Sequence, residues 1–113
     1  MALLDIKNRV EGDALIVELN GEIDKSTVVV VKQSLVPLIE QQSATVARFV
    51  LDCSHLTFIN SEGIGTLMSL YASLAKREKK MILVGLQPNV RDVLDLIGVT
   101  KLIPNFPDLA SVK

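Results

Sequence analysis

The 113-residue sequence has few of the side chains that carry out catalysis or bind metals. It contains one Cys, one His and no Trp, and aromatic residues make up 4% of the chain. A single Cys cannot form an internal disulfide, and a single His excludes a histidine-based metal cluster. The scarcity of aromatic residues also argues against a base-stacking surface for nucleic acid. We therefore expect no metal site, no cofactor and no nucleic-acid partner.

Neither positively nor negatively charged residues are in excess. The 12 Lys and Arg residues nearly balance the 13 Asp and Glu residues, which gives a net charge of −1. Such a chain exerts no long-range attraction on nucleic acid or on an anionic membrane. Apolar residues amount to 49%, but no run approaches the roughly 20 residues of a membrane-spanning helix. With no export signal apparent at the N-terminus, we expect one cytoplasmic domain over residues 1–113, without membrane insertion.

Two strand patterns open the chain. Residues 4–10 alternate partly between apolar and polar side chains, and residues 14–19 form a second apolar stretch that closes near Gly21. A turn signal around Gly12 lies between them. This arrangement predicts an N-terminal β-hairpin.

Residues 28–39 fit two structures. The valines at 28–31 favour a strand by intrinsic propensity, whereas apolar residues recur at helical spacing over the longer window. Length decides for a helix, with a kink at Pro37, because a proline inside a helix removes a backbone hydrogen bond. Three polar residues that precede the helix could cap its first turn: Asp24, Ser26 or Thr27.

The rest of the chain alternates between strand and helix patterns. The expected elements, in order, are a strand at 49–51, a helix from Ser61, a strand at 81–84, a helix from Pro88 to a stop at Gly98, a short strand at 102–103 and a last helix near Asp108. This order predicts an α/β sandwich with a mixed sheet.

Cys53 and His55 are the one pair that could form a nucleophilic unit. No third residue is evident to orient the pair, so a half-buried Cys at a strand end and a His in a surface loop is the better interpretation. A dinucleotide-binding fingerprint is also absent, because Met68 stands where its third glycine should be. We therefore expect a protein that is not an enzyme, and keep a small Cys–His enzyme only as a contrasting alternative.

One stretch, residues 56–65, is distinctive. An apolar segment passes through the polar residues Asn60, Ser61 and Glu62 directly into a long amphipathic helix. Asn60 or Ser61 is an N-cap candidate, and a cap alone would explain the pattern. A helix N-terminus also favours anions, so a phosphate on Ser61 would be well placed. Gly63 and Gly65 would leave this turn free of bulk, so that a partner could approach closely.

Two segments make the chain resemble the STAS domain family of bacterial anti-sigma factor antagonists. Gly21-Glu22-Ile23-Asp24 matches the family's Gly-Glu-(Leu/Ile/Val)-Asp after the second strand. Residues 58–65 match apolar-apolar-Asp-Ser-(Ser/Thr)-Gly-(Leu/Ile)-Gly. The resemblance implies a STAS-type sandwich, with a four- to five-stranded mixed sheet and about four helices packed mainly on one face. It also resolves residues 28–39 towards helix.

The resemblance further implies a function. Antagonists of this family bind an anti-sigma factor that is also a serine kinase, which phosphorylates them, and a PP2C-type phosphatase reverses the reaction. Carried over to this sequence, the phosphoacceptor is Ser61. The residues expected to bind the partner are Asp24, Ser26, Thr27, Asn60, Glu62, Gly63 and Ile64.

Two positions depart from the family pattern. Asn60 stands where the family has Asp and carries no charge, and Glu62 replaces a second hydroxyl with a fixed negative charge. The expected function is that of a partner-switching regulator, which binds its kinase when unphosphorylated and is released when Ser61 is phosphorylated. The alternative is a stand-alone STAS subunit of a membrane transport or lipid-trafficking complex, in which Ser61 is only a cap.

Overall fold

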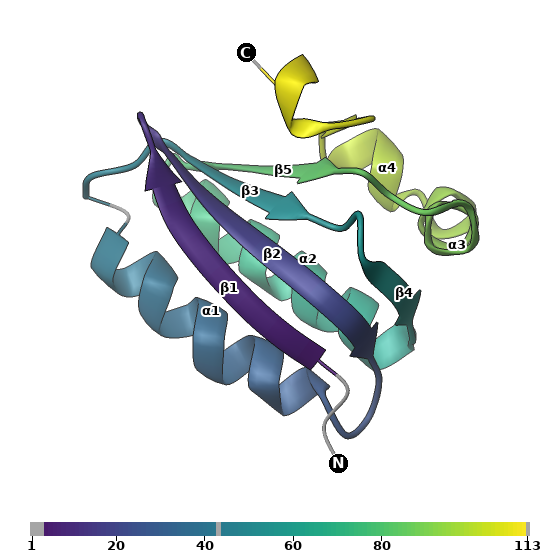
Figure 1. Cartoon of the computed structure of the whole chain (residues 1–113). Helices are drawn as coiled ribbons and strands as arrows, with labels where there is room; N and C mark the ends of the chain where they lie inside the picture. Colours follow the sequence, from purple (N-terminus) through teal and green to yellow (C-terminus); the bar gives the residue numbers. More distant parts are fainter. Residues whose placement is uncertain (1–3, 43, 113) are drawn as a thin grey trace.

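A computed structural model of the chain describes residues 4–42 and 44–112. The described residues form six strands and four helices that are mixed along the sequence (Figure 1). The strands are β1 (Leu4–Glu11), β2 (Ala14–Ile23), β3 (Arg48–Asp52), β4 (Leu56–Ile59), β5 (Lys80–Val84) and β6 (Asn105–Phe106). The helices are α1 (Val28–Gln42), α2 (Ser61–Lys76), α3 (Pro88–Ile97) and α4 (Val99–Leu102), followed by a 3-10 turn, η1 (Leu109–Ser111).

The strands form one mixed sheet. Five strands follow the order β1-β2-β3-β5-β6, and β4 pairs with β2. The β1–β2 hairpin is antiparallel, and the other pairs are parallel. The long strand β2 pairs with two strands on the same side: its residues 14–18 pair with β3, and its last residues pair with β4. The predicted mixed α/β sheet is confirmed. It has six strands in the described residues instead of the expected four or five, because the two-residue strand β6 adds to the edge at β5.

The central strands bury side chains on both faces, since successive residues of a strand point in opposite directions. Helices α1 and α2 cover one face (Figure 1). The strand residues of the main core on this face include Leu15, Val17, Leu19, Phe49, Leu51, Met81 and Leu83. A smaller cluster on the opposite face consists of Ala14, Ile16, Val50, Ile82 and Val84, against which Phe106, Leu109 and Val112 pack.

Residues 28–42 form a helix despite their five valines, as length and spacing over residues 28–39 predict. The helix continues beyond Pro37 to its end at Gln42. Its buried residues recur at helical spacing, so one face packs on the sheet. Burial of these residues outweighs the weak helix propensity of valine, which costs only a few tenths of a kcal/mol per residue relative to better helix formers.

Two sequence-based expectations need correction. The strand predicted at 102–103 is wrong, because the short helix α4 occupies residues 99–102 and the last strand begins at Asn105. The left-handed backbone of Gly98 (φ 92°) ends α3 and lets the chain start α4 at once. The last helix expected near Asp108 is a single 3-10 turn, whose residue Ser111 donates its backbone N–H to the Asp108 carboxylate.

The end of α2 contains an unusual backbone conformation. Glu78 has φ 59°, and it is the one non-glycine residue in the described part of the chain with a positive φ. Its N–H donates to the carbonyl of Ala75, and the N–H of Lys79 reaches back to Leu74 over 2.8 Å. These two bonds satisfy carbonyl groups of the last helical turn in the pattern usually completed by glycine.

The left-handed position of Glu78 leads to a stability prediction. Glu78→Gly should raise the free energy of unfolding by about 0.5 to 1 kcal/mol. Glycine adopts a positive φ without strain, and its greater freedom in the unfolded chain offsets only part of this gain. Chemical denaturation measures the change. Glu78→Ala is the matched control, since it also removes the carboxylate but keeps Cβ, and it should give no such gain. Equal gains in both variants would show that charge, not backbone strain, is responsible.

Candidate functional site

Two loops meet at one end of the sheet. Strand β2 ends at Ile23 and β4 ends at Ile59, and these two residues are paired in parallel. The backbone N–H of Asn60 then donates to the carbonyl oxygen of Ile23 over 3.0 Å. The loop before α1 therefore lies beside the start of α2. We call this region the two-loop surface and define it by five residues that are exposed or half-buried: Asp24, Ser26, Asn60, Ser61 and Glu62.

The first loop is held by the Asp24 carboxylate. One of its oxygens accepts hydrogen bonds from the backbone N–H of Ser26 (2.9 Å), the Ser26 hydroxyl (2.7 Å) and the backbone N–H of Thr27 (3.1 Å). The hydrogen bonds from Ser26 and then those from Thr27 lower the pKa of Asp24. Thr27 in turn donates its hydroxyl to the carbonyl of Glu22 over 2.7 Å. Asp24 thus holds the conformation of this turn through its side-chain hydrogen bonds.

The second loop contains the residue that caps α2. Asn60 is the N-cap, and its side-chain oxygen accepts the backbone N–H of Gly63 over 2.9 Å. An amide oxygen performs this task as well as a carboxylate does, because Asn and Asp rank together as caps. Ser61 is the first helical residue and is exposed. Within the described residues its hydroxyl takes part in no hydrogen bond, so it is free for other chemistry.

Three of the residues expected to bind a partner lie inside the protein. The side chain of Thr27 is fully buried, and Ile64 is only 5% exposed. Gly63 is buried as well. These three residues support the two-loop surface from inside the protein. The other expected residues are exposed or half-buried and are accessible to a partner: Asp24, Ser26, Asn60 and Glu62.

The two glycines of the turn have different roles. A Cβ on Gly63 would lie 2.6 Å from Ile23 Cγ2 and 2.8 Å from Ile59 Cγ1, so α2 can approach the strand ends only without a side chain here. A Cβ on Gly65 would meet nothing within 4 Å. Gly65 therefore leaves open space on the outer side of α2, as the sequence predicts. The same prediction is wrong for Gly63, which is buried and allows close packing inside the protein.

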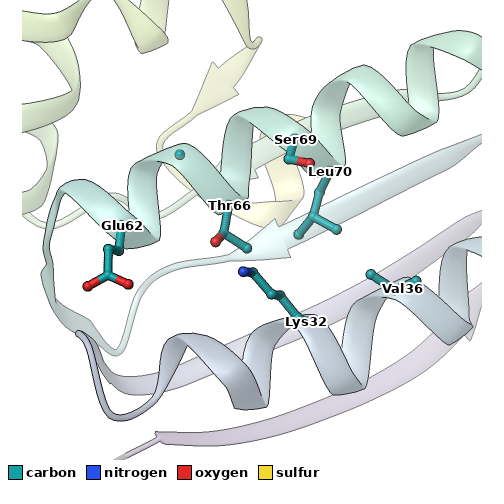
Figure 2. A pocket seen from close by; sticks show the side chains of 7 residues that line it. Lys32, Val36, Glu62, Thr66, Ser69 and Leu70 are labelled. Carbon is teal, nitrogen blue, oxygen red and sulfur yellow. The ribbon is translucent and has the colours of Figure 1, made fainter.

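A groove between α1 and α2 continues from the two-loop surface. It has a volume of about 350 Å³ and is lined by Lys32, Val36, Glu62, Gly65, Thr66, Ser69 and Leu70. Figure 2 shows the Glu62 carboxylate near one end of the groove and the Lys32 ammonium group reaching towards α2. These two charged groups, both within the described residues, form no ion pair with each other. Lys32 carries no signal in the sequence that assigns it to this groove, because only the packing of α1 against α2 places it here.

Cys53 and His55 do not form a nucleophilic pair. Cys53 is 2% exposed, and its thiol contacts the carbonyl of Leu51 at 3.6 Å. Burial, together with the charge of Asp52, raises the pKa of the Cys53 thiol to about 12. His55 is exposed and lies 3.4 Å from the hydroxyl of Ser54. Because the nucleophile is the thiolate, this arrangement disfavours thiol chemistry. The described residues also contain no cluster of acidic, His and Cys side chains that could hold a metal ion.

Comparison with known families identifies the type of domain. The STAS domain, as described from its known members, matches residues 5–112. The chain belongs to the STAS domain family. The two motifs that carried the resemblance, residues 21–24 and 58–65, thus lie on the paired strand ends and loops that build the two-loop surface of this STAS domain. Among its described helices, none is both long and apolar enough to cross a membrane.

Known proteins similar to this STAS domain include regulators. It is 28% identical to the anti-sigma F factor antagonist of Paenibacillus polymyxa over 92 residues, which cover 81% of this chain and 77% of that protein. The crystal structure of an anti-sigma factor antagonist from Mycobacterium paratuberculosis superposes with a TM-score of 0.83 at 24% identity, covering 95% of this chain and 88% of that one. The phosphorylated form of the Bacillus cell fate determinant SpoIIAA gives a TM-score of 0.70 at 19% identity, covering 96% and 95%.

The contrast between the two glycines can be tested directly. Gly63→Ala should lower the free energy of unfolding by about 1 to 3 kcal/mol, because its Cβ forces Ile23 and Ile59 apart. Gly65→Ala is the matched control and should raise it by up to about 1 kcal/mol, since alanine is the better helix former. Chemical denaturation measures both values. A similar change in the two variants would contradict the close approach at Gly63.

The Asp24 turn predicts a pH-dependent stability. Asp24→Ala should lower the melting temperature most near neutral pH, where the wild-type carboxylate is charged and accepts its hydrogen bonds. Because the folded pKa lies below the ordinary value of 3.8, this advantage is present above 3.8 and is lost as the pH falls through the folded pKa. Thermal unfolding between pH 2 and 7 measures the difference.

Asp24→Asn provides the control for this experiment. It keeps a side-chain oxygen acceptor but does not titrate, so its difference from Asp24→Ala should stay constant with pH. A gap between wild type and Asp24→Ala that is equally wide at pH 2 and pH 7 would show that the carboxylate charge does not stabilise the turn.

Proposed function

We propose that this STAS domain is an anti-sigma factor antagonist that works by partner switching. Unphosphorylated, its two-loop surface binds an anti-sigma factor that is also a serine kinase. The kinase phosphorylates Ser61, which releases the domain, and a PP2C-type phosphatase restores the original state. The domain is a substrate in this scheme and has no enzymatic activity of its own. The observation that carries the proposal is the exposed Ser61 hydroxyl at the first position of α2, which the cap leaves free.

The position of Ser61 suits reversible phosphorylation. Its exposed hydroxyl can enter a kinase or phosphatase cleft, and Gly65, one turn further along α2, adds no bulk beside it. A phosphate here carries about −1.5 to −2 charges at a helix N-terminus, where free N–H groups and the helix dipole favour an anion. Both chemical states are therefore compatible with the same fold.

Charge explains how the phosphate changes binding. Glu62 already places a negative charge beside Ser61, and Asp24 lies on the neighbouring loop. A phosphate would concentrate a third acidic group on this small surface. In the interface it would have to lose water and would repel acidic groups of the partner. A change from mostly bound to mostly free requires on the order of 5 kcal/mol, which a dianion in a contact area can supply.

Relatives support the proposal. The similar protein from Paenibacillus polymyxa is named an anti-sigma F factor antagonist, and the similar Mycobacterium paratuberculosis structure is described as an anti-sigma factor antagonist. The structure of SpoIIAA, a protein of the same fold, is known in a phosphorylated form. Asn60 departs from the acidic residue of the family motif but preserves the α2 cap, so the local geometry that presents Ser61 is retained.

Phosphosite mapping and binding measurements test this function. Mass spectrometry of the protein from its native host should find phosphate on Ser61. The serine kinase that carries out this reaction should bind Ser61→Ala like the wild type and should bind Ser61→Asp at least about 100-fold more weakly, since an aspartate carries part of the phosphate charge. Titration calorimetry with the purified kinase measures these affinities.

A control variant separates a local effect from a change in net charge. Ala72→Glu adds one negative charge at an exposed position of α2, about 16 Å from Ser61 along the helix at 1.5 Å per residue. It should bind the kinase like the wild type. If Ser61→Asp bound as tightly as Ser61→Ala, or if no growth condition gave phosphate on Ser61, the partner-switching function would be wrong.

A further inference from the structure

Strand β4 is held by the sheet on one edge only. Within the described residues it pairs with β2 and with no other strand, and the register shifts between Gly21 and Glu22 of β2. Strand β3, in comparison, pairs with both β2 and β5. A strand of four residues with one irregular neighbour forms few ladder hydrogen bonds, so other contacts must hold its second edge in place.

Two side-chain amides occupy this second edge. Gln87 donates from Nε2 to the carbonyl oxygen of Ser54 over 2.8 Å, and Asn89 donates from Nδ2 to the carbonyl oxygen of Thr57 over 2.7 Å. Gln87 immediately precedes α3, and Asn89 is the second residue of that helix. Helix α3 lies beside β4 in Figure 1. The side chains of Gln87 and Asn89 therefore take the place of a neighbouring strand, and we call them the amide clamp.

Helix α3 is a firm support for the clamp. Its residues Val90 and Leu94 are each 1% exposed and belong to the same core cluster as Leu56 and Ile59 of β4. Pro88 occupies the first helical position, where its fixed φ favours the start of a helix. The backbone that carries the clamp is therefore ordered, and each amide reaches β4 from a fixed origin.

Strand β4 leads directly into the proposed phosphoacceptor. Thr57 lies four residues before Ser61, and between them Asn60 bonds to Ile23 through its backbone N–H. Within the described residues the Ser61 hydroxyl takes part in no hydrogen bond, so the location of its oxygen depends on the backbone that precedes it. Phosphoryl transfer requires this oxygen in line with the leaving group, and a displacement of about 1 Å costs roughly 100-fold in rate.

We infer that Asn89, assisted by Gln87, is a positioning residue for the phosphorylation of Ser61. By holding the second edge of β4, the amide clamp keeps β4 against β2 and keeps the start of α2 in the geometry that a kinase can use. The inference rests on the proposed function of Ser61 as the phosphoacceptor. Neither residue of the clamp belongs to the two-loop surface, so the clamp acts through β4 and not by contact with the partner.

Hydrogen exchange measured by NMR tests the clamp without any partner. Asn89→Ala removes the donor, and Asn89→Asp removes it without changing the size of the side chain. Both variants should speed exchange of the Asn60 N–H about tenfold, because the loss of one hydrogen bond makes separation of β4 from β2 more frequent. Helix α3 itself should not be weakened in Asn89→Asp, since an acidic residue is favourable in the first turn of a helix. The N–H groups of β3 should exchange as in the wild type, because β3 keeps both of its neighbouring strands.

A matched variant makes this result specific. Asn8→Asp is the same substitution at an exposed residue of β1, which pairs with β2 and not with β4, and it should leave the exchange of the Asn60 N–H unchanged. Unchanged exchange in both Asn89 variants would overturn the inference. Faster exchange in Asn89→Asp alone would also overturn it, because repulsion by the new charge would then be the cause. An equal acceleration in β3 would do the same, since it would indicate a general loss of stability instead of a local clamp.

Kinetics test the consequence for Ser61. The single-turnover rate at which saturating kinase phosphorylates Asn89→Ala should be at least about threefold lower than for the wild type, whereas the affinity of the unphosphorylated domain for the kinase should stay the same. An unchanged rate would show that Asn89 does not position Ser61. An equal loss of affinity would show instead that Asn89 contacts the kinase, which also contradicts the inference. If the wild type received no phosphate on Ser61, the proposed function would be wrong, while hydrogen exchange would still decide whether Asn89 holds β4.

Discussion

The first turn of α2 rests directly on the ends of β2 and β4, and the geometry of the two-loop surface depends on this contact. Ile23 and Ile59, the paired last residues of those strands, leave no room for a Cβ at position 63. The missing side chain lets the helix start close to the sheet, where Asn60 can cap it while bonded through its backbone to Ile23. Ser61 then follows as the first helical residue and faces solvent.

Much of this arrangement could be predicted from the sequence, because its causes are local. Spacing of apolar residues over 28–39 predicted the helix that the structure extends to Gln42, and polar residues before a long amphipathic stretch identified the start of α2. The family motifs then indicated the sheet and the place of Ser61. These signals depend on periodicity and capping, which neighbouring residues decide largely by themselves.

The features that the sequence did not reveal depend on tertiary contacts. Strand β4 is four residues long, too short to show a clear alternation, and exists because it pairs with the end of β2. The burial of Thr27 and the different roles of Gly63 and Gly65 follow from how α1 and α2 meet the strands. Residues 102–103 were apolar enough for a strand, but Gly98 directs the chain into another helical turn first. Register and packing, not propensity, decide such positions.

The burial of Cys53 has a practical consequence. This is the one thiol of the chain, and burial holds its pKa at about 12, so almost none of it is the reactive thiolate at neutral pH. A cysteine introduced at any exposed position would therefore be the single site that reacts with a maleimide dye or a spin label. The wild-type background needs no prior removal of its own cysteine. The domain is thus ready for distance measurements in which each attached probe has a known location.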